Sequence, residues 1–235
     1  MLCLSVIPSA DASHVEHQSA PPAPASFLGC CSLRDAVLAG GAACIKALLP
    51  LHLANTDIEG NSALMLACRD GHVDCVKTLL QQHASMQLAA VNGSGCTALM
   101  LACMSGRLDC IDTLLQQDAP IQLRARDGDG RTALMHAAIR GHSVCISALL
   151  QRDGLIQLRA RDSGDRTALI YAACRNRVEC INALLQQHAS TQVTACDSEG
   201  NTALMIAASI GRVDCVNALL QHDAAKQLSA HGYGG

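Results

Sequence analysis

The sequence predicts an all-α solenoid with short β-hairpins, built from about six units with a period of 35 residues. Five Ser/Thr-Ala-Leu segments carry this period, beginning at Ser62, Thr97, Thr132, Thr167 and Thr202. A cysteine series has the same spacing, at Cys75, Cys110, Cys145, Cys180 and Cys215. Self-similarity at a fixed period of about 20 to 50 residues is typical of chains in which each unit buries its apolar face against its neighbours.

The chain divides into a tail, a repeat domain and a short C-terminal segment. Four of the six prolines lie before residue 25, which predicts a disordered Pro-, Ala- and Ser-rich tail over residues 1–30. The repeat domain is predicted over residues 31–225 and a C-terminal tail over residues 226–235. The first unit is shortened, because Cys44 precedes Cys75 by 31 residues rather than 35. The expected units lie near residues 31–60, 61–95, 96–130, 131–165, 166–200 and 201–225.

Each unit is expected to begin with a short helix. In the third unit Thr97 is a suitable N-cap, since its hydroxyl can accept from a free amide of the first turn, and Ala98 to Ser105 is rich in helix formers. Gly106 then ends the helix, because glycine readily adopts the left-handed conformation found at helix C-termini. The equivalent positions hold Gly71, Gly141, Asn176 and Gly211.

A second helix and a strand are expected to follow. The helix is predicted from about Leu108 to Gln117, with Asp109 in the first turn, where a negative charge favours the helix dipole. The Leu-Arg-Ala-Arg segments that start at Leu123 and Leu158 alternate apolar and charged residues, and each precedes a turn rich in Gly and Asp. This period of two predicts a short strand that enters a β-hairpin.

The unit resembles the ankyrin repeat. The segment from Asp197 to Ala208, with Gly211 and the pair Leu219 and Leu220 after it, is similar to the ankyrin pattern Asp-x-x-Gly-x-Thr-Pro-Leu-His-x-Ala followed by a Leu-Leu pair. This resemblance covers about residues 31–225 and implies a non-enzymatic module that binds a protein through its hairpin tips and first helices, with no cofactor. The Thr-Ala-Leu-Met and Asp-Cys-Val motifs are also similar to those of ankyrin-only proteins of some protist parasites.

The departures from the ankyrin pattern carry expectations of their own. Ala replaces the Pro of the pattern and Met or Ile replaces its His, so apolar packing is expected where His would form hydrogen bonds. Residues that tolerate a positive φ stand where the family has Gly after the second helix. They are His83, Asp118, Asp153, His188 and Asp223. The two extra residues of the period predict longer hairpins.

Charge and composition argue against several classes of protein. Seventeen Lys and Arg against 20 Asp and Glu leave a net charge of −3, too near balance for a general polyanion binder or a membrane-surface protein. The chain has three aromatic residues and no Trp, so a base-stacking nucleic-acid module is not expected. No membrane partner is expected either, and the predicted compartment is the reducing cytoplasm, with the cytoskeleton and the nucleus left open.

The sequence contains few candidate residues for metal binding or catalysis. The 14 cysteines are interpreted mainly as small buried hydrophobes, with the most accessible thiols expected at Cys3, Cys30, Cys31 and Cys96. Cys68, His72 and Cys75 have a loosely zinc-like spacing, but the next unit has Arg107 in place of the His, so no metal site is expected. Glu occurs only four times and no nucleotide-binding loop or nucleophile motif is present, so no enzyme activity and no cofactor are expected.

The positions that vary between units are interpreted as a recognition surface. On the first helices the candidates are Met104, His136, Ile139, Arg140, Tyr171 and Arg175. From Arg124 to Arg177 there are ten Arg and five Asp, and six of these arginines are expected to line adjacent hairpins. They are Arg124, Arg126, Arg131, Arg159, Arg161 and Arg166. Such a patch would select an acidic protein segment, because Arg binds carboxylates in a bidentate manner; the equal alternative is that these arginines solvate the loops and pair with neighbouring Asp residues.

Two other roles remain open at this point. The last unit keeps the interior apolar pattern at Val213, Val216, Leu219 and Leu220, and no polar cap follows. Because solenoids need capped ends, three interpretations stay open: residues 221–235 fold back over the last unit, the chain is a segment of a longer array, or the end pairs with another chain. The last interpretation gives the alternative function, a structural scaffold that stacks through its C-terminal repeat. A regulatory subunit of an enzyme such as a kinase is the other alternative, which only the identity of the partner would separate from an adaptor.

Overall fold

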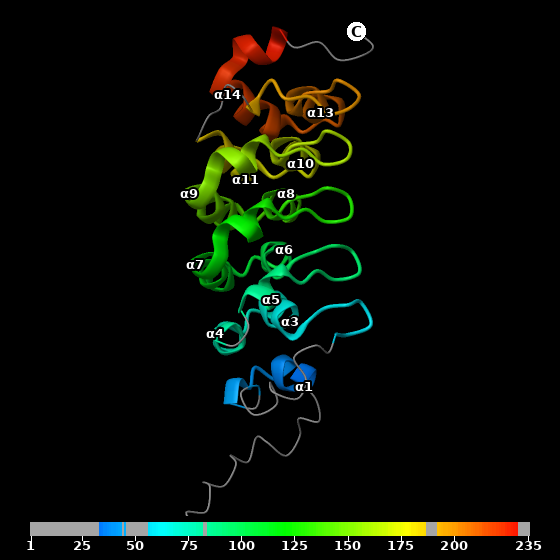
Figure 1. Cartoon of the computed structure of the whole chain (residues 1–235). Helices are drawn as coiled ribbons and strands as arrows, with labels where there is room; N and C mark the ends of the chain where they lie inside the picture. The colour runs from blue at the N-terminus through cyan, green and yellow to red at the C-terminus, as the bar shows by residue number, and fades with distance from the viewer. Residues whose placement is uncertain (1–32, 44, 46–55, 82–83, 187–191, 230–235) are drawn as a thin grey trace, which may run out of the picture.

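The computed structural model describes residues 33–43, 45, 56–81, 84–186 and 192–229, and it shows an all-α solenoid of stacked helix pairs (Figure 1). The tail expected over residues 1–30 lies outside the described residues, as do Cys3, Cys30, Cys31, His83 and His188. The unit boundaries predicted from the period are not tested by this structure and stay a prediction.

The first helices of the units form one row. Neighbours in this row pack side by side from α1 to α13. The row consists of α1 (Leu33–Leu38), α3 (Ala63–Asp70), α6 (Ala98–Met104), α8 (Ala133–Arg140), α10 (Ala168–Cys174) and α13 (Ala203–Ser209). Each unit therefore contributes one short helix to the side of the stack that faces the loops (Figure 1).

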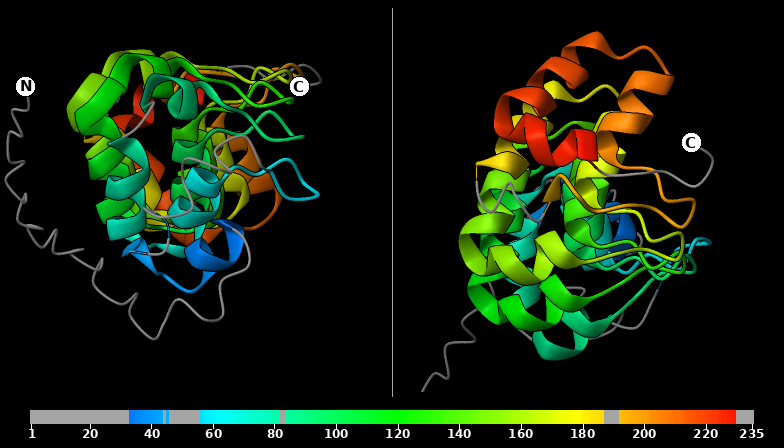
Figure 2. Two further views of the ribbon diagram at one scale, coloured as in Figure 1. Left: turned by 60° about the horizontal axis from the view of Figure 1, so that its bottom comes forward. Right: turned by 90° about the horizontal axis from the view of Figure 1, so that it is seen from above.

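The second helices form the other row, and each packs on the first helix of its own unit, apart from α5 (Ala84–Ala89), which packs on α4 and α7. This row consists of α4 (Val73–Leu80), α5 (Ala84–Ala89), α7 (Leu108–Arg124), α9 (Ser143–Arg159), α11 (Val178–Leu185) and α14 (Val213–Ser229). Viewed along the stack, the loops gather on the side away from this row (Figure 2).

The predicted caps of the first helix are confirmed. The Thr hydroxyl accepts from the amide three residues later at 3.3–3.4 Å in four units, namely at Thr97, Thr132, Thr167 and Thr202. Gly71, Gly106, Gly141, Asn176 and Gly211 all have a positive φ, between 56° and 91°, as expected of left-handed C-terminal positions. Local sequence therefore sets both ends of this helix.

The predicted end of the second helix is wrong for α7 and α9, whereas α4 and α11 end at Leu80 and Leu185, near the predicted position. We expected it near Gln117, but α7 continues to Arg124 and α9 to Arg159, so that Asp118 and Asp153 lie inside helices rather than in left-handed turns. The longer helix places the side chains of Gln122 and Leu123 in the core, 0% and 1% exposed. The sequence of a single repeat does not reveal that this extra turn is buried.

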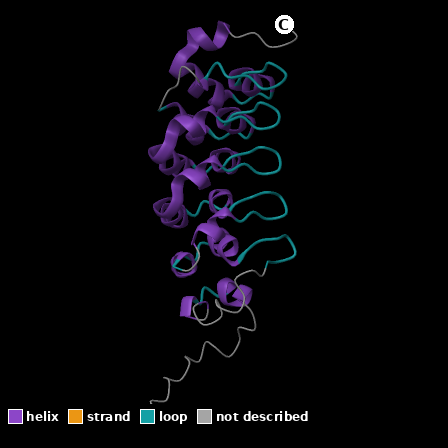
Figure 3. Ribbon diagram, in the orientation of Figure 1, coloured by secondary structure: helices purple, strands orange, loops and turns teal. Residues whose placement is uncertain are grey.

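The expected strand at Leu123 and Leu158 is therefore also wrong, because both residues belong to helices. The part of the chain that the structure describes contains no strand (Figure 3). Two isolated antiparallel bridges remain of the predicted hairpins, Thr56 with Ser62 and Cys196 with Thr202. We call the loops finger loops; they comprise residues 56–62, 90–97, 125–132, 160–167 and 195–202.

The core lies between the two rows and is built from Ala, Leu, Ile, Met and Cys side chains. The cysteine series at Cys75, Cys110, Cys145, Cys180 and Cys215 is at most 2% exposed, which confirms its interpretation as buried small hydrophobes. Burial raises the pKa of the Cys180 thiol to about 11, so this thiol stays protonated and unreactive at neutral pH. The ten cysteines of the described part are all free.

Candidate functional site

An acidic or amide side chain shapes each finger loop. The Oδ1 atom of Asp127 accepts from the backbone N–H groups of Asp129 and Arg131, at 3.0 and 2.8 Å. The same pair of bonds is made by Asp57, Asn92, Asp162 and Asp197. In the aspartates, the second carboxylate oxygen is left to receive a further side chain.

Backbone hydrogen bonds join each finger loop to the next. Glu59 O, Ser94 O, Asp129 O and Gly164 O each accept from an amide of the following loop, at 2.9–3.0 Å. The donors are the N–H groups of Gly93, Gly128, Ser163 and Ser198. The loops therefore form one continuous edge beside the row of first helices (Figure 3).

Two of the six predicted finger arginines are exposed and also connect neighbouring loops through hydrogen bonds to backbone carbonyl oxygens. Arg126 Nη1 donates to Gly130 O of its own loop, at 3.0 Å, and to Arg161 O of the next loop. Arg161 repeats this arrangement one unit later, with bonds to Asp165 O and Cys196 O at 3.0 and 2.5 Å. Their role in holding adjacent loops together was missed in the sequence, although the identical 35-residue spacing of the two arginines is its signal.

The other predicted arginines lie in three different settings. Arg124 and Arg159 are the exposed last residues of α7 and α9, and Arg166 is exposed on its loop. Arg131 is partly buried and forms an ion pair with Asp129, at 2.7 Å. The six finger arginines therefore do not make one uniform patch.

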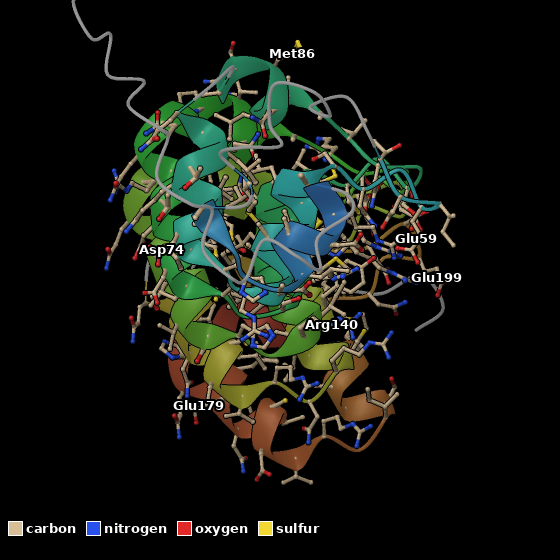
Figure 4. All side chains as sticks on the ribbon, turned by 90° about the horizontal axis from the view of Figure 1, so that it is seen from below. Glu59, Asp74, Met86, Arg140, Glu179 and Glu199 are labelled. Atoms are coloured by element: carbon tan, nitrogen blue, oxygen red, sulfur yellow. The ribbon has the colours of Figure 1, made fainter. Side chains whose placement is uncertain are left out.

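A pocket of about 410 Å³ lies between the finger loops and the first helices. Its lining residues are Met104, Arg131, His136, Ile139, Arg140, Tyr171, Arg175 and Arg177. Seven of these eight were predicted as site residues, and the structure brings them together from three successive units. Figure 4 places Arg140 on the side of the first helices, away from Asp74 and Glu179, which lie along the second row.

Arg177 is the lining residue that the sequence did not predict. It stands at the junction before α11, where the equivalent residues are His72, Arg107 and His142, and these side chains cover a glycine of the preceding unit. An added Cβ at Gly141 would lie 2.9 Å from Arg177 Cδ. A basic residue recurring at this junction was the available signal.

Tyr171 links two finger loops at the floor of the pocket. Its hydroxyl donates to Asp162 Oδ2 and accepts from Arg131 Nε, at 3.0 Å for the latter. The Arg131 guanidinium also lies over the ring, 5.6 Å from its centroid, within cation–π range. Tyr171 is only 6% exposed, and burial together with the Asp162 bond raises the pKa of its hydroxyl. It therefore shapes the pocket more than it offers free surface.

His136 occupies the equivalent place one unit earlier. Its Nε2 lies 2.8 Å from Asp127 Oδ2, and the imidazole is 8% exposed. Burial lowers the pKa of His136, although the hydrogen bond and charge of Asp127 oppose this shift. The neutral imidazole is therefore the form that the folded protein favours.

This shift predicts a pH dependence of stability. An unfolded histidine, with a pKa of about 6.5, takes up its proton at a higher pH than folded His136, so stability present above about pH 6.5 is lost as the pH falls toward the folded pKa. His136→Gln keeps a donor for Asp127 but does not titrate. In urea unfolding, we expect the wild type to lose more stability than this variant between about pH 7.5 and pH 5.5; parallel losses would contradict the assignment.

The accessible thiol predicted at Cys96 is not found. Cys96 is 5% exposed, and burial raises the pKa of its thiol. The spacing set Cys68, His72 and Cys75 is not brought together in the described part of the chain. The potential ligand atoms that lie within 4.8 Å of one another there belong to Cys96, Asp127 and His136. No helix among the described residues has the length and apolar character needed to cross a membrane.

Comparison with known families agrees with the stacked helix pairs. The family described as Ankyrin repeats (3 copies) matches residues 33–127, 117–195 and 166–231. Because these matches cover most of the chain, the chain belongs to the ankyrin repeat family. Domains of this family are usually non-catalytic binding modules.

Solved structures of ankyrin repeat domains are also similar to this chain. The human ASB11 ankyrin repeat domain is similar at 28% identity and a TM-score of 0.69, over 86% of this chain and 87% of that one. The ankyrin repeat domain of Bcl-3, a member of the IkappaB protein family, is similar at 28% identity and a TM-score of 0.75, over 87% of this chain and 90% of that one. No curated protein matches the sequence.

Proposed function

We propose that this chain is a non-enzymatic adaptor that binds an acidic segment of a partner protein in the groove between its finger loops and first helices. The observation that carries the proposal is the pocket lined by Arg131, Arg140, Arg175 and Arg177. Four guanidinium groups around one hollow of about 410 Å³ present a concentrated positive surface in a chain whose net charge is −3. Family membership supports a protein as the partner.

Within the pocket, the arginines divide into paired and unpaired groups. Arg131 is already held by Asp129 and Tyr171. Arg140 and Arg175 are exposed and form no ion pair with another described residue, so their charges are available to a ligand. Met104 and Ile139 are half-buried beside them and supply apolar contact for the stem of a Glu side chain. The chemistry therefore favours a carboxylate-bearing segment, bound by charge-assisted hydrogen bonds.

A charge reversal tests this proposal. Arg140→Glu/Arg175→Glu should abolish selection of Asp- and Glu-rich peptides from a displayed peptide library. Two charge-assisted contacts of about 1.5–3 kcal/mol each correspond to a loss of affinity of at least ~100-fold. The matched control is Lys77→Glu/Arg152→Glu, which makes the same charge change at exposed positions of the second row.

The readout is the affinity of the best selected peptide for each protein, measured by fluorescence anisotropy. The control should bind within a few-fold of the wild type after allowance for net charge. Equal losses in both double variants would show a non-specific charge effect, and no enrichment of acidic peptides by the wild type would remove the proposal. Affinity capture from lysate with the same variants then names the natural partner.

Self-association through the last repeat is the second candidate. Val213 is 66% exposed, whereas its equivalents Val73 and Val178 pack partly against the core. Of the three valines at this repeat position, only the one in the last unit is exposed, as a stacking interface would require. Sedimentation analysis at rising protein concentration separates the two proposals, because an adaptor keeps one mass and a scaffold gains mass.

The specific role, the cellular location and the excluded partners remain predictions. A regulatory subunit of an enzyme such as a kinase would use the same groove, and partner identity distinguishes it from an adaptor. Cytoplasmic location, the absence of a nucleic-acid partner and the closer resemblance to ankyrin-only proteins of protist parasites also stay predictions.

A further inference from the structure

Three metal-ligating side chains from two successive units meet at the edge of the groove. The Cys96 thiol, a carboxylate oxygen of Asp127 and a ring nitrogen of His136 all lie within 4.8 Å of one another. Among the residues that the structure describes, this is the one such group of His, Cys, Asp or Glu. It combines sulfur, oxygen and nitrogen donors.

Local structure holds each donor in place. Asp127 uses Oδ1 for the backbone amides of its loop, which leaves Oδ2 directed at His136. The backbone N–H of Cys96 donates to Asn92 Oδ1 at 2.9 Å, at the base of the preceding loop. Cys96 is 5% exposed, and the Asp127 and His136 side chains are 6% and 8% exposed. The donors are thus pre-positioned and largely shielded from water.

Comparison between units shows that the repeat scaffold does not require this set. The equivalents of Cys96 are Asn61, Arg131, Arg166 and Asn201. The equivalents of His136 are Leu66, Leu101, Tyr171 and Ile206. Tyr171 also hydrogen-bonds the aspartate of its own finger loop, Asp162, so the bond between His136 and Asp127 has a structural parallel in the next unit. The Cys96 thiol has no such parallel. It occurs in the unit whose neighbour supplies the imidazole of His136.

We propose that Cys96, Asp127 and His136 form a binding site for a divalent transition metal ion of the zinc type. Thiolate, imidazole and carboxylate are all ligands that Zn²⁺ accepts, and three protein ligands leave a fourth position for water. That water can enter from a second hollow of about 600 Å³, which all three residues line. The bound ion would join the loop of one unit to the first helix of the next.

Protons and charge balance when the metal ion binds, and no further reactant is needed. The ion replaces the thiol proton of Cys96, which leaves to solvent, and the resulting thiolate and the Asp127 carboxylate together neutralise the two positive charges. His136 gives up its hydrogen bond to Asp127 and coordinates through one ring nitrogen, while the proton of the neutral imidazole is carried on the other ring nitrogen. Bond lengths of about 2.0–2.3 Å place tetrahedral donors roughly 3.3–3.6 Å apart, so side-chain shifts of about 1 Å close the site.

The two arginines that line this hollow do not oppose the ion with their full charge, and Arg69 is paired with Asp70 at 3.0 Å. Arg131 lies beside this hollow, but its guanidinium is paired with Asp129 at 2.7 Å and donates to Tyr171. Asp129 therefore offsets the positive charge nearest to the site. The local charge balance remains compatible with a cation.

The test is Co²⁺ and Zn²⁺ titration of the full chain under reducing conditions. Co²⁺ should give a thiolate-to-metal charge-transfer band and the visible bands of a tetrahedral site, and Zn²⁺ should remove both. Cys96→Ser, Asp127→Asn and His136→Gln should each weaken Zn²⁺ binding at least ~10-fold, by calorimetry. Cys196→Ser, at a half-buried thiol outside the site, is the matched control and should bind like the wild type.

Circular dichroism of the metal-free proteins shows whether each variant is folded. We expect Asp127→Asn and Cys96→Ser to fold, because the first retains the acceptor for the loop amides and the second changes one atom. The proposal is overturned if folded Cys96→Ser binds Zn²⁺ and develops the Co²⁺ bands as the wild type does. It is also overturned if the wild type gives no thiolate charge-transfer band. Loss in the three site variants with retention in Cys196→Ser establishes the site.

Discussion

Gly95→Ala should lower the free energy of unfolding by roughly 2–4 kcal/mol, the sum of backbone strain at a positive φ and overpacking against a neighbouring loop. Gly95 has a φ of +77°, a conformation that L side chains rarely adopt. An added Cβ would lie 2.8 Å from Gly128 N, an atom of the next finger loop. That amide donates to Ser94 O, so it cannot move away without breaking a bond between loops.

Gly211→Ala separates the two contributions. Gly211 has a similar φ of +70°, but an added Cβ there would meet nothing within 4 Å. This variant should cost only the strain of the left-handed conformation, about 1–2 kcal/mol. Equilibrium urea unfolding of both metal-free variants provides the comparison, and equal losses would show that loop stacking contributes nothing at Gly95.

Gln157→Glu should lower the free energy of unfolding at neutral pH by about 3–5 kcal/mol, since it leaves a buried charge without a partner. Gln157 is 1% exposed, and its Nε2 donates to Leu123 O of the preceding unit. Gln122 and Gln192 make the same bond to Leu88 O and Leu158 O, the latter at 2.8 Å. A carboxylate at this position would face a carbonyl oxygen and have no donor to offer it.

The pH dependence and an apolar control identify the cause. Burial raises the pKa of a carboxyl group, so the deficit should be complete above the folded pKa and should shrink as the pH falls toward the unfolded value of about 4.3. Gln157→Met should cost at most about 1.5 kcal/mol, because it loses one hydrogen bond but also removes Oε1, which has no partner in the described part. Urea unfolding at about pH 7.5 and pH 4.5 measures both; a deficit in Gln157→Glu that is independent of pH would contradict the explanation.

Features that depend on neighbouring residues were predictable from the sequence. The Thr caps, the left-handed position after the first helix and the Asp that begins a finger loop all act within about ten residues, and the structure confirms their placement. Seven of the eight pocket residues were also predicted, because variable positions in a regular repeat lie on a shared surface. The repeat period, together with these local signals, was sufficient to predict the architecture.

Features that depend on contacts between units were not predictable. The alternation of Leu123, Ala125 and their charged neighbours looks like a strand locally, yet helix α7 continues because Gln122 and Leu123 are buried against the preceding unit. Arg126 looks like a free surface charge, yet its guanidinium joins two loops. In both cases the partner lies 34 or 35 residues away.

The sequence by itself determined the repeat class, the number of units and the boundaries of the first helices, because these follow from the period and from local capping chemistry. Only the tertiary structure decided which polar groups meet. It placed Cys96 beside Asp127 and His136, and it gathered Arg131, Arg140, Arg175 and Arg177 around one pocket. The physical reason is that stacking brings equivalent positions of successive units into contact, so the chemistry of each site depends on pairs of residues that the chain itself keeps far apart.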